Sequence, residues 1–349
     1  MTTAGRRRPN EPDSAGGLGG KSLTVDIDGP VHYLDFGGPA NGPLLIAVHG
    51  LGGSAVNWSA IAPLLTKNYR LLAPDLSGHG LTASGRRGTD VAANRLLLHR
   101  FIELVSNGPV ILVGNSMGGM IALIEAGTVP DGVAGLILVD PALPLMPARP
   151  DPVVTAVFAL SAAPVLGPLI MSQRRFMRVE SIVGQTFALC CADPSRVPEH
   201  IVAQHVEVAR QRVRMAGDGR DLAHAARSVV ETAGFLRGQA YRRAIKEITC
   251  PVLVVHGERD RLVPVSAARA AAKAHPDWEL VVLPEVGHVP QIEHPTETAA
   301  AFTAWLTGAG AAAAEKARPR RSKRRRAPTL RPTPPEPKRR RTDTSTPAA

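Results

Sequence analysis

Ser116 has the sequence surroundings of a catalytic nucleophile. It lies at the centre of Gly-Asn-Ser-Met-Gly (114–118), which follows the apolar run 110–113 and precedes an apolar helical pattern. Small residues on both sides of a serine let the chain turn sharply from a strand into a helix, and this turn lifts the hydroxyl group to the carboxyl edge of a sheet. The pattern therefore predicts that the Ser116 hydroxyl attacks an electrophilic carbon.

A serine hydroxyl needs a base to accept its proton, and a histidine that a carboxylate orients is suited to this task. His288 follows the strand-like run 280–283 after a short loop, which places it at the same edge of a parallel sheet as Ser116. Asp260 follows the strand-like run 252–255. The order serine, aspartate, histidine is the one expected for this chemistry on a strand–turn–helix scaffold. We therefore predict that Asp260 orients His288 and that His288 activates Ser116.

Other polar residues near predicted strand ends have alternative roles. Asp140 directly follows the apolar run 133–139 and is the alternate acid. Asp260 is preferred to Asp140 because Pro141 follows Asp140 and because the loop around Asp260 is the better sequence context for the catalytic acid. Three residues are expected to brace their own loops rather than act as bases: His49, Asp75 and His79.

Apolar runs of strand length alternate with helical patterns along most of the chain. A continuous apolar run such as 44–48 is typical of a strand that is buried on both faces of a parallel sheet. Helical periodicity follows several of these runs, for example at 91–105, where Asp90 is the expected N-cap. The alternation predicts an α/β fold with a mostly parallel, doubly wound sheet. The predicted strands are 22–27, 31–36, 44–48, 69–73, 110–113, 133–139, 252–255 and 280–283.

One interval between predicted strands is too long for an ordinary connection. About 100 residues separate residue 139 from residue 252, whereas connections in an α/β domain usually need only ~2–6 residues outside their helix. The interval therefore predicts an inserted, largely helical cap. The predicted organisation is a flexible leader (1–21), a core in two parts (22–142 and 241–308), the helical cap between them (143–240) and a disordered basic tail (309–349).

The net charge of +11 is concentrated at the end of the chain. Residues 311–349 contain 13 Lys/Arg and 3 Asp/Glu, so this segment carries +10 and the rest of the chain is close to neutral. The segment lacks large apolar residues, which predicts that it does not fold alone. Its basic clusters at 323–326 and 338–341 are suited to an anionic membrane surface or nucleic acid as partner. The clusters contain no aromatic residues, so base stacking is not indicated.

These features together resemble the α/β-hydrolase superfamily, in the serine-nucleophile, esterase- and lipase-like branch that has an inserted cap. The resemblance covers about residues 22–307 and includes His-Gly-Leu-Gly-Gly (49–53), Asp-Leu-Ser-Gly-His-Gly (75–80) and the segment 288–295. It implies an oxyanion hole formed by the backbone N–H groups of Leu51 and Met117. Such donors typically contribute ~3–4 kcal/mol each to stabilisation of the transition state.

The resemblance also implies a reaction class. Haloalkane dehalogenases and epoxide hydrolases of this superfamily carry aspartate at the nucleophile position, so Ser116 favours hydrolysis of carboxylic esters or related acyl bonds. Gly-Asn-Ser-Met-Gly-Gly (114–119) is also similar to carbon–carbon bond hydrolases, although these usually have Trp where this chain has Val289. Two further alternatives are a cofactor-free haloperoxidase-like enzyme, whose relatives usually carry a smaller cap, and a catalytically silent scaffold with a polyanion-binding tail.

Cofactor and targeting motifs are not evident. The sequence has no H-E-x-x-H, no spaced Cys/His set and no Walker loop, so we expect catalysis without a metal or coenzyme. Only three cysteines are present, and no apolar run follows the arginines at 6–8. These two observations predict a reducing, cytoplasmic location. The sequence does not indicate an oligomeric state.

The uncharged stretch 152–173 gives one indication of the substrate. Its length would allow a membrane span, but Ser116 precedes it and His288 follows it, so a span would separate residues that must meet. It is expected to be either a cap helix packed on the core or an apolar lid over an acyl pocket. The second hypothesis predicts an apolar acyl substrate and a peripheral contact with lipid.

Overall fold

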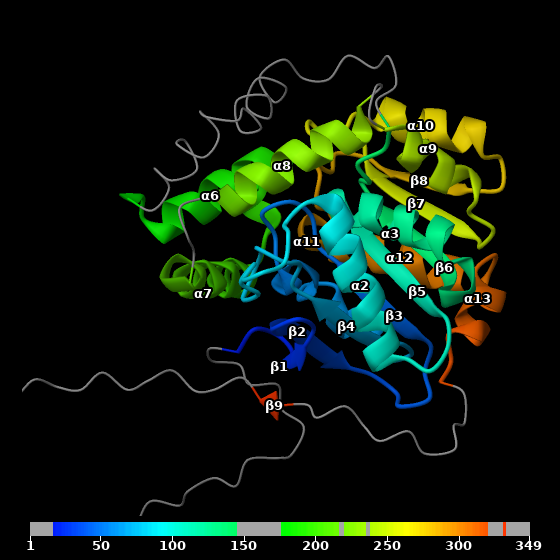
Figure 1. Cartoon of the computed structure of the whole chain (residues 1–349). Coiled ribbons are helices and arrows are strands. Elements are labelled where there is room, and N and C mark those ends of the chain that lie inside the picture. Colours follow the sequence, from blue (N-terminus) through cyan, green and yellow to red (C-terminus); the bar gives the residue numbers. More distant parts are fainter. Residues whose placement is uncertain (1–16, 145–175, 216–219, 235–237, 320–330, 333–349) are drawn as a thin grey trace, which may run out of the picture.

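The computed structural model describes residues 17–144, 176–215, 220–234, 238–319 and 331–332 of the 349-residue chain. Strands and helices alternate along most of this part (Figure 1). The strands are β1 (Lys21–Asp26), β2 (Pro30–Gly37), β3 (Leu44–Val48), β4 (Arg70–Pro74), β5 (Val110–Asn115), β6 (Val133–Val139), β7 (Val252–Gly257), β8 (Glu279–Leu283) and β9 (Arg331–Pro332). The α-helices are α1 (Ala62–Leu65), α2 (Val91–Val105), α3 (Met117–Thr128), α6 (Val179–Cys190), α7 (Glu199–Met215), α8 (Arg220–Ala233), α9 (Gln239–Lys246), α10 (Val265–Ala274), α11 (Pro290–Glu293), α12 (Pro295–Thr307) and α13 (Ala311–Lys316). The short 3₁₀ helices are η1 (Ala55–Trp58), η2 (Pro130–Gly132) and η4 (Pro194–Arg196).

The described strands form one sheet in the order β8-β7-β6-β5-β3-β4-β2-β1-β9. From β8 to β4 neighbouring strands run parallel, and β2, β1 and β9 continue the sheet with antiparallel pairing. The carboxyl ends of the parallel strands therefore share one edge. Because β5, β7 and β8 all end at this edge, the residues that follow them are brought together.

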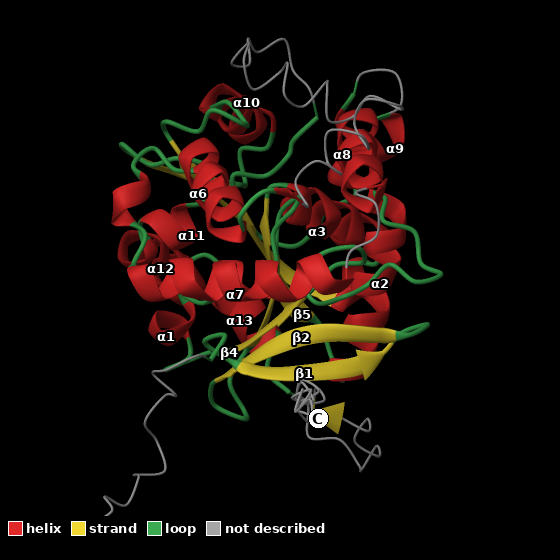
Figure 2. Cartoon of the chain, turned by 90° about the vertical axis from the view of Figure 1, so that its left-hand side faces the viewer, coloured by secondary structure: helices red, strands yellow, loops and turns green. Residues whose placement is uncertain are grey.

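Helices cover both faces of the sheet. Side chains of α2, α3, α9 and α10 pack on one face, and side chains of α1, α12 and α13 pack on the other. Figure 2 shows this arrangement, with α1 and α12 to the left of the strands and α2 and α3 to the right. In β3, Leu44, Ile46 and Val48 join the first cluster, while Leu45 and Ala47 join the second. The doubly wound α/β fold predicted from the sequence is therefore confirmed.

Helices α6, α7 and α8, called the inserted helices below, lie between β6 and α9 in the sequence. Figure 1 shows these green helices gathered beside the sheet. They dock on loops of the core: the guanidinium group of Arg212 donates to the carbonyl groups of Gly78 and Thr82, and Val91 N–H donates to Ser228 Oγ (2.9 Å). Within the described ranges, no helix has both the length and the apolar character needed to cross a membrane. The uncharged stretch 152–173 lies outside the described residues.

The prediction that a disordered tail begins at residue 309 is wrong. The segment after α12 turns into α13, where Ala313 and Ala314 are buried against the sheet. The N–H of Leu44 donates to the carbonyl oxygen of Ala317 (3.0 Å), which fixes the end of this segment beside β3. The physical reason is that alanine has the highest helix propensity and that its small side chain packs closely against neighbours.

The outer parts of the predicted leader and tail are mostly not described. Beyond residue 319 the structure describes only β9, which pairs with β1, and the first 16 residues also lie outside the described part. Leu18 is already buried, and its carbonyl oxygen accepts a hydrogen bond from Ser59 Oγ (3.0 Å). Packed structure therefore begins before the predicted end of the leader at residue 21.

Truncation at two positions tests the corrected boundary. Deletion of residues 311–349 should lower the free energy of unfolding by about 2–5 kcal/mol, because it exposes apolar surface and leaves the Leu44 N–H without its acceptor. Deletion of 320–349 should leave that free energy nearly unchanged, because it spares α13. Urea unfolding followed by circular dichroism measures the difference. Equal stabilities of the two truncated proteins would contradict the packing of α13 on the sheet.

Candidate active site

Ser116 occupies the turn between β5 and α3. Its backbone has φ 54° and ψ −117°, a conformation that is uncommon for a residue with a side chain and typically costs of order 1–3 kcal/mol. Two hydrogen bonds hold it: Ser116 N–H donates to Val139 O, and Ala142 N–H donates to Ser116 O, both at 3.0 Å. Gly118 is required beside it, because a Cβ there would overlap the carbonyl oxygen of Val48. The sharp strand–turn–helix geometry expected from the sequence is present.

Asp260 and His288 form a buried pair at the ends of neighbouring strands. Asp260 follows β7, His288 follows β8, and His288 Nδ1–H donates to Asp260 Oδ2 at 2.7 Å. The other carboxylate oxygen accepts the N–H groups of Leu262 (2.7 Å) and Val263 (3.0 Å). Burial is the largest single effect on Asp260 and would raise its pKa, but the charges and hydrogen bonds of its neighbours, with His288 first among them, together hold this pKa below its usual range. Asp260 is thus an ionised carboxylate that orients the ring, and Nε2 is the nitrogen on the far side for proton transfer.

Asn115 ties the loop of His288 to the turn of Ser116. Its side-chain amide donates to the carbonyl oxygens of His288 and Val139, both at 3.1 Å. Since Asn115 directly precedes Ser116, one side chain links the two loops that carry the predicted nucleophile and base. The sequence pattern does not identify this role, because the position between glycine and serine in G-x-S-x-G accepts any residue type.

Asp140, the alternate acid, is held by other groups. It follows β6 with φ 44° and no exposed surface, and its Oδ1 accepts the N–H of Gly257 (2.9 Å). Its Oδ2 has no hydrogen-bond partner among the described residues, and a carboxyl oxygen of Asp140 lies within 4.8 Å of one of Asp260. Burial, and after it the charge of Asp260, raises the pKa of Asp140 well above its usual range. The structure therefore pairs His288 with Asp260, and Asp140 lies beside that pair with its neutral form favoured.

One cluster among the described residues has the residue types of a metal site. Potential ligand atoms of Asp140, His256 and Asp260 all lie within 4.8 Å of one another. Asp260 Oδ2 already binds His288 Nδ1, so a cation bound here would compete with the histidine for the acid. Burial also lowers the pKa of His256, whose Nε2 lies 2.9 Å from Val263 O. We therefore assign the cluster to orientation of the acid rather than to metal binding.

The predicted oxyanion-hole residues flank Ser116. Met117 is the first residue of α3 and is fully buried, and the first N–H groups of a helix have no carbonyl partner within that helix. Leu51 lies in the loop after β3. This loop passes beside the serine, because a Cβ placed on Gly50 would lie 3.1 Å from Ser116 Cβ. That the two N–H groups bind an oxyanion stays a prediction.

His49, Asp75 and His79 brace loops, as expected from the sequence. Nε2 of His49 accepts the N–H of Leu76 (3.1 Å), and the Asp75 carboxylate lies 2.6 Å from Nδ1 of His32. Burial is the largest effect on His79 and lowers its pKa to about 3, so this ring is neutral. These groups hold the loops after β3 and β4 rather than supply a second base.

Comparison with known proteins identifies similar chains. The model of the family described as "Alpha/beta hydrolase family" matches residues 45–301. The chain is 30% identical over 291 residues to Lipase 1 of Psychrobacter immobilis, a match that covers 82% of this chain and 83% of that protein. It is 26% identical over 285 residues to a 2-hydroxy-6-oxo-6-(2'-aminophenyl)hexa-2,4-dienoic acid hydrolase of Metapseudomonas resinovorans, covering 79% of this chain and 87% of that protein.

Two further similarities differ in what they cover. The chain is 28% identical over 272 residues to the dihydrolipoyllysine-residue acetyltransferase component of the acetoin cleaving system of Pseudomonas putida. That match covers 75% of this chain but only 63% of that protein, so the chain spans less than two thirds of it. The solved structure of a serine hydrolase involved in carbazole degradation superposes with a TM-score of 0.63 at 24% identity, covering 82% of this chain and 98% of that chain. At this identity, the structural likeness shows the fold.

Proposed function

The chain belongs to the α/β-hydrolase family, and from this premise we propose that it is a serine hydrolase that cleaves carboxylic esters or related acyl bonds. The proposed triad is Ser116, His288 and Asp260. The observation that carries the proposal is the 2.7 Å hydrogen bond from His288 to Asp260, in a loop that Asn115 ties to the turn of Ser116. Similarity to Lipase 1 of Psychrobacter immobilis supports an ester as the substrate.

The proposed reaction has two halves. In the first, His288 Nε2 accepts the hydroxyl proton of Ser116 while Oγ attacks the ester carbonyl carbon. The tetrahedral intermediate collapses to an acyl-enzyme. The departing alkoxide receives from His288 the proton that came from Ser116 and leaves as the alcohol. In the second, His288 removes a proton from water, the resulting hydroxide attacks the acyl carbon, and Ser116 leaves with the proton as the free acid is released. Asp260 stays ionised throughout and stabilises the imidazolium ring.

Charge that develops on the carbonyl oxygen needs hydrogen-bond donors in fixed positions. We assign this role to the backbone N–H groups of Leu51 and Met117, the first beside the serine in space and the second next to it in the chain. Loss of one such donor typically slows turnover by about 10²–10³. No metal or coenzyme takes part in the proposed steps.

A substrate panel tests the proposed bond type. We expect nitrophenyl esters to be hydrolysed, with a preference for apolar acyl chains. A vinylogous diketone run beside them tests carbon–carbon bond cleavage. Turnover of the diketone without turnover of any ester would replace the ester proposal with the carbon–carbon alternative.

The carbon–carbon alternative has one specific observation in its favour. The chain is similar to the dienoic acid hydrolase of Metapseudomonas resinovorans over 79% of its length. Against it stands Val289, at the position where such enzymes usually have Trp.

Covalent labelling of Ser116 by a fluorophosphonate tests the silent-scaffold alternative, because labelling requires an activated serine. An unlabelled wild-type protein would favour the scaffold.

The segment 320–349 is proposed as a polyanion-binding region of a cytoplasmic protein. It contains 11 Lys/Arg and 2 Asp/Glu, and contacts of such clusters with phosphates release counterions. Deletion of 320–349 should abolish salt-sensitive co-sedimentation with anionic vesicles or retention on duplex DNA, while turnover of a short ester stays within about twofold. Full-length protein in low and high salt is the control. Unchanged polyanion binding by the truncated protein would contradict the assignment.

A further inference from the structure

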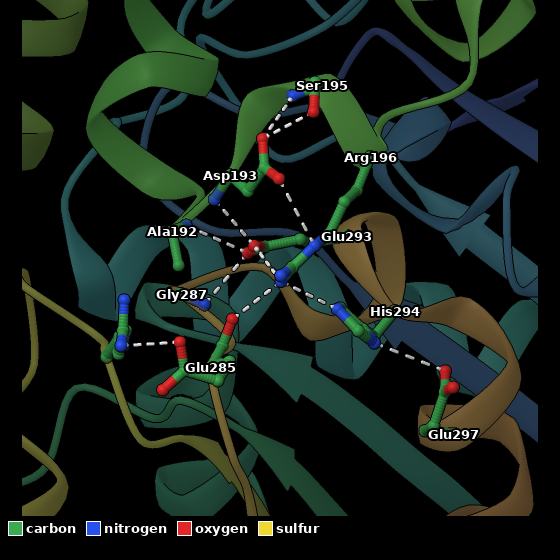
Figure 3. A network of polar contacts seen from close by, with 10 residues as sticks. Ala192, Asp193, Ser195, Arg196, Glu285, Gly287, Glu293, His294 and Glu297 are labelled. Atoms are coloured by element: carbon green, nitrogen blue, oxygen red, sulfur yellow. Dashed lines mark hydrogen bonds and ion pairs between the residues drawn. The ribbon is translucent and has the colours of Figure 1, made fainter.

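Glu293 has a buried carboxylate that the proposed reaction does not use. It is the last residue of α11, five positions after His288, and its side chain has no exposed surface. A carboxylate is costly to bury unless hydrogen bonds replace its water, so each of its partners contributes to the fold around it. Figure 3 shows these partners gathered around the two oxygens.

The partners of Glu293 come from two segments that are about 100 residues apart. Oε2 accepts the N–H groups of Gly287 (2.9 Å), in the loop of His288, and of Ala192 (3.1 Å), just after α6. Oε1 accepts the N–H of Asp193 (2.9 Å) and lies 3.4 Å from Nη1 of Arg196. One side chain therefore joins the histidine loop, defined as residues 284–289, to the linker 191–198 between α6 and α7.

The same two segments also touch directly. The N–H of His288 donates to the carbonyl oxygen of Cys190 (2.6 Å), and a Cβ on Gly287 would overlap that same carbonyl group. Arg196 Nη1 donates to the carbonyl oxygen of Glu285 (2.8 Å), as Figure 3 shows. The histidine loop is thus held by the inserted helices on one side and by Asn115 on the other.

Apolar packing supports this junction. A cluster of buried side chains combines residues of the inserted helices and their linker with two residues that follow His288. Its members are Val183, Phe187, Cys191, Val197, Ile201, Val206, Val289 and Ile292. Helices α6, α7 and α11 therefore form one packed unit next to His288.

We propose that Glu293 is a positioning residue, which locks the histidine loop to the inserted helices so that His288 reaches its working position only when those helices are seated on the core. Only the kinetic test of this inference rests on the proposed function. The link runs through the hydrogen bonds that the Glu293 carboxylate accepts from the N–H groups of Gly287 and of residues 192 and 193. Arg196, which contacts both Glu293 and Glu285, reinforces it. Its consequence is that a change in the seating of the inserted helices moves the base.

The variant Glu293→Gln tests the link. An amide has one acceptor oxygen, so its NH₂ group must face one pair of the N–H donors now bound by the carboxylate. We expect kcat for a short nitrophenyl ester to fall about 10–100-fold, with KM changed less than about threefold, because a misplaced base affects the transition state more than substrate binding. Glu297→Gln is the matched control, since Glu297 is exposed and its carboxylate lies 3.5 Å from His294 Nδ1, outside the contacts that hold the histidine loop. This variant should keep wild-type kcat.

A spectroscopic measurement separates this inference from the proposed function. The Nδ1 proton that His288 shares with Asp260 should give a far-downfield proton resonance, assigned by its loss in His288→Asn. In Glu293→Gln this resonance should broaden or vanish through exchange with water, whereas Glu297→Gln should retain it. If wild-type protein neither hydrolyses esters nor reacts with a fluorophosphonate, the proposed function fails, and the resonance still tests Glu293.

Two results would overturn the inference. The first is an unchanged kcat per folded molecule in Glu293→Gln, with folded protein measured by circular dichroism. The second is reduced turnover with an unchanged His288 resonance, which would place the effect of Glu293 elsewhere. If Glu293→Gln does not fold, Arg196→Gln decides, because it removes the contacts of Arg196 with Glu293 and with Glu285 from the same link. Because Arg196 contacts both Glu293 and Glu285, the variant weakens the link at Glu293 Oε1 and should lower kcat by about 3–10-fold. An unchanged kcat would contradict the inference.

Discussion

Replacement of Ser116 by alanine should reduce ester hydrolysis by about 10⁴–10⁶-fold and leave the fold intact. The variant lacks the oxygen that forms the acyl-enzyme, so the remaining turnover comes from direct attack by water on substrate held in the site. The backbone hydrogen bonds that hold the turn, from Ser116 N–H to Val139 and from Ala142 to Ser116 O, are kept. Initial rates on a short nitrophenyl ester measure the loss, and circular dichroism measures the fold.

A second serine provides the matched control for this prediction. Ser106 lies at the end of α2, and its hydroxyl group donates to Gly108 O (2.7 Å). Ser106→Ala should retain turnover and fluorophosphonate labelling, whereas Ser116→Ala should lose both. Turnover near the wild-type rate in a folded Ser116→Ala protein would remove Ser116 from the mechanism.

The variant Asp260→Asn should lose about 10⁴ in turnover, far more than Asp140→Asn. An amide at position 260 cannot stabilise the imidazolium form of His288 and favours the wrong tautomer. At position 140 burial raises the pKa and favours the neutral form, and an amide of similar size can still accept the Gly257 N–H. We expect this second variant to lose at most about tenfold, the usual worth of one hydrogen bond.

The turnover rates of Asp260→Asn and Asp140→Asn, measured at several pH values, test this ranking. The free energy of unfolding of both variants should lie within about 2 kcal/mol of the wild-type value, because each replacement is nearly isosteric. The opposite ranking, with Asp140→Asn the slower enzyme, would transfer the role of acid to Asp140. Equal losses would mean that the two carboxyl groups act as one unit.

The sequence was sufficient to predict the residues that follow strands. Strands β5, β7 and β8 have apolar runs bounded by loops, and parallel strands end at one edge, so Ser116, Asp260 and His288 could be brought together without a structure. The 2.7 Å hydrogen bond between Asp260 and His288 agrees with that prediction. The predicted and observed strand ends differ by one or two residues, because a sequence pattern does not record where the hydrogen bonding between strands stops.

The sequence could not predict residues whose role depends on distant backbone groups. Glu293 and Asn115 bind N–H and carbonyl groups that are brought beside them only by the folded chain. The sequence pattern predicts that the alanine run of α13 belongs to the tail, because small side chains carry little hydrophobic signal and become buried only where a sheet surface is close. In each case the residue type is visible in the sequence, but the groups that fold against it are not.

The pairing of β6 with β7 has a consequence for folding. More than 100 residues separate Val139 from Val252, and closing so long a loop carries an entropic cost before any contact between the strands compensates for it. Strands β3 to β6 have shorter separations, so the half of the sheet that carries the serine can assemble first. Pulse-labelled hydrogen exchange during refolding should therefore protect β3 and β5 before β7 and β8. During that interval the chain would hold its strained serine turn without the acid and base that make it reactive.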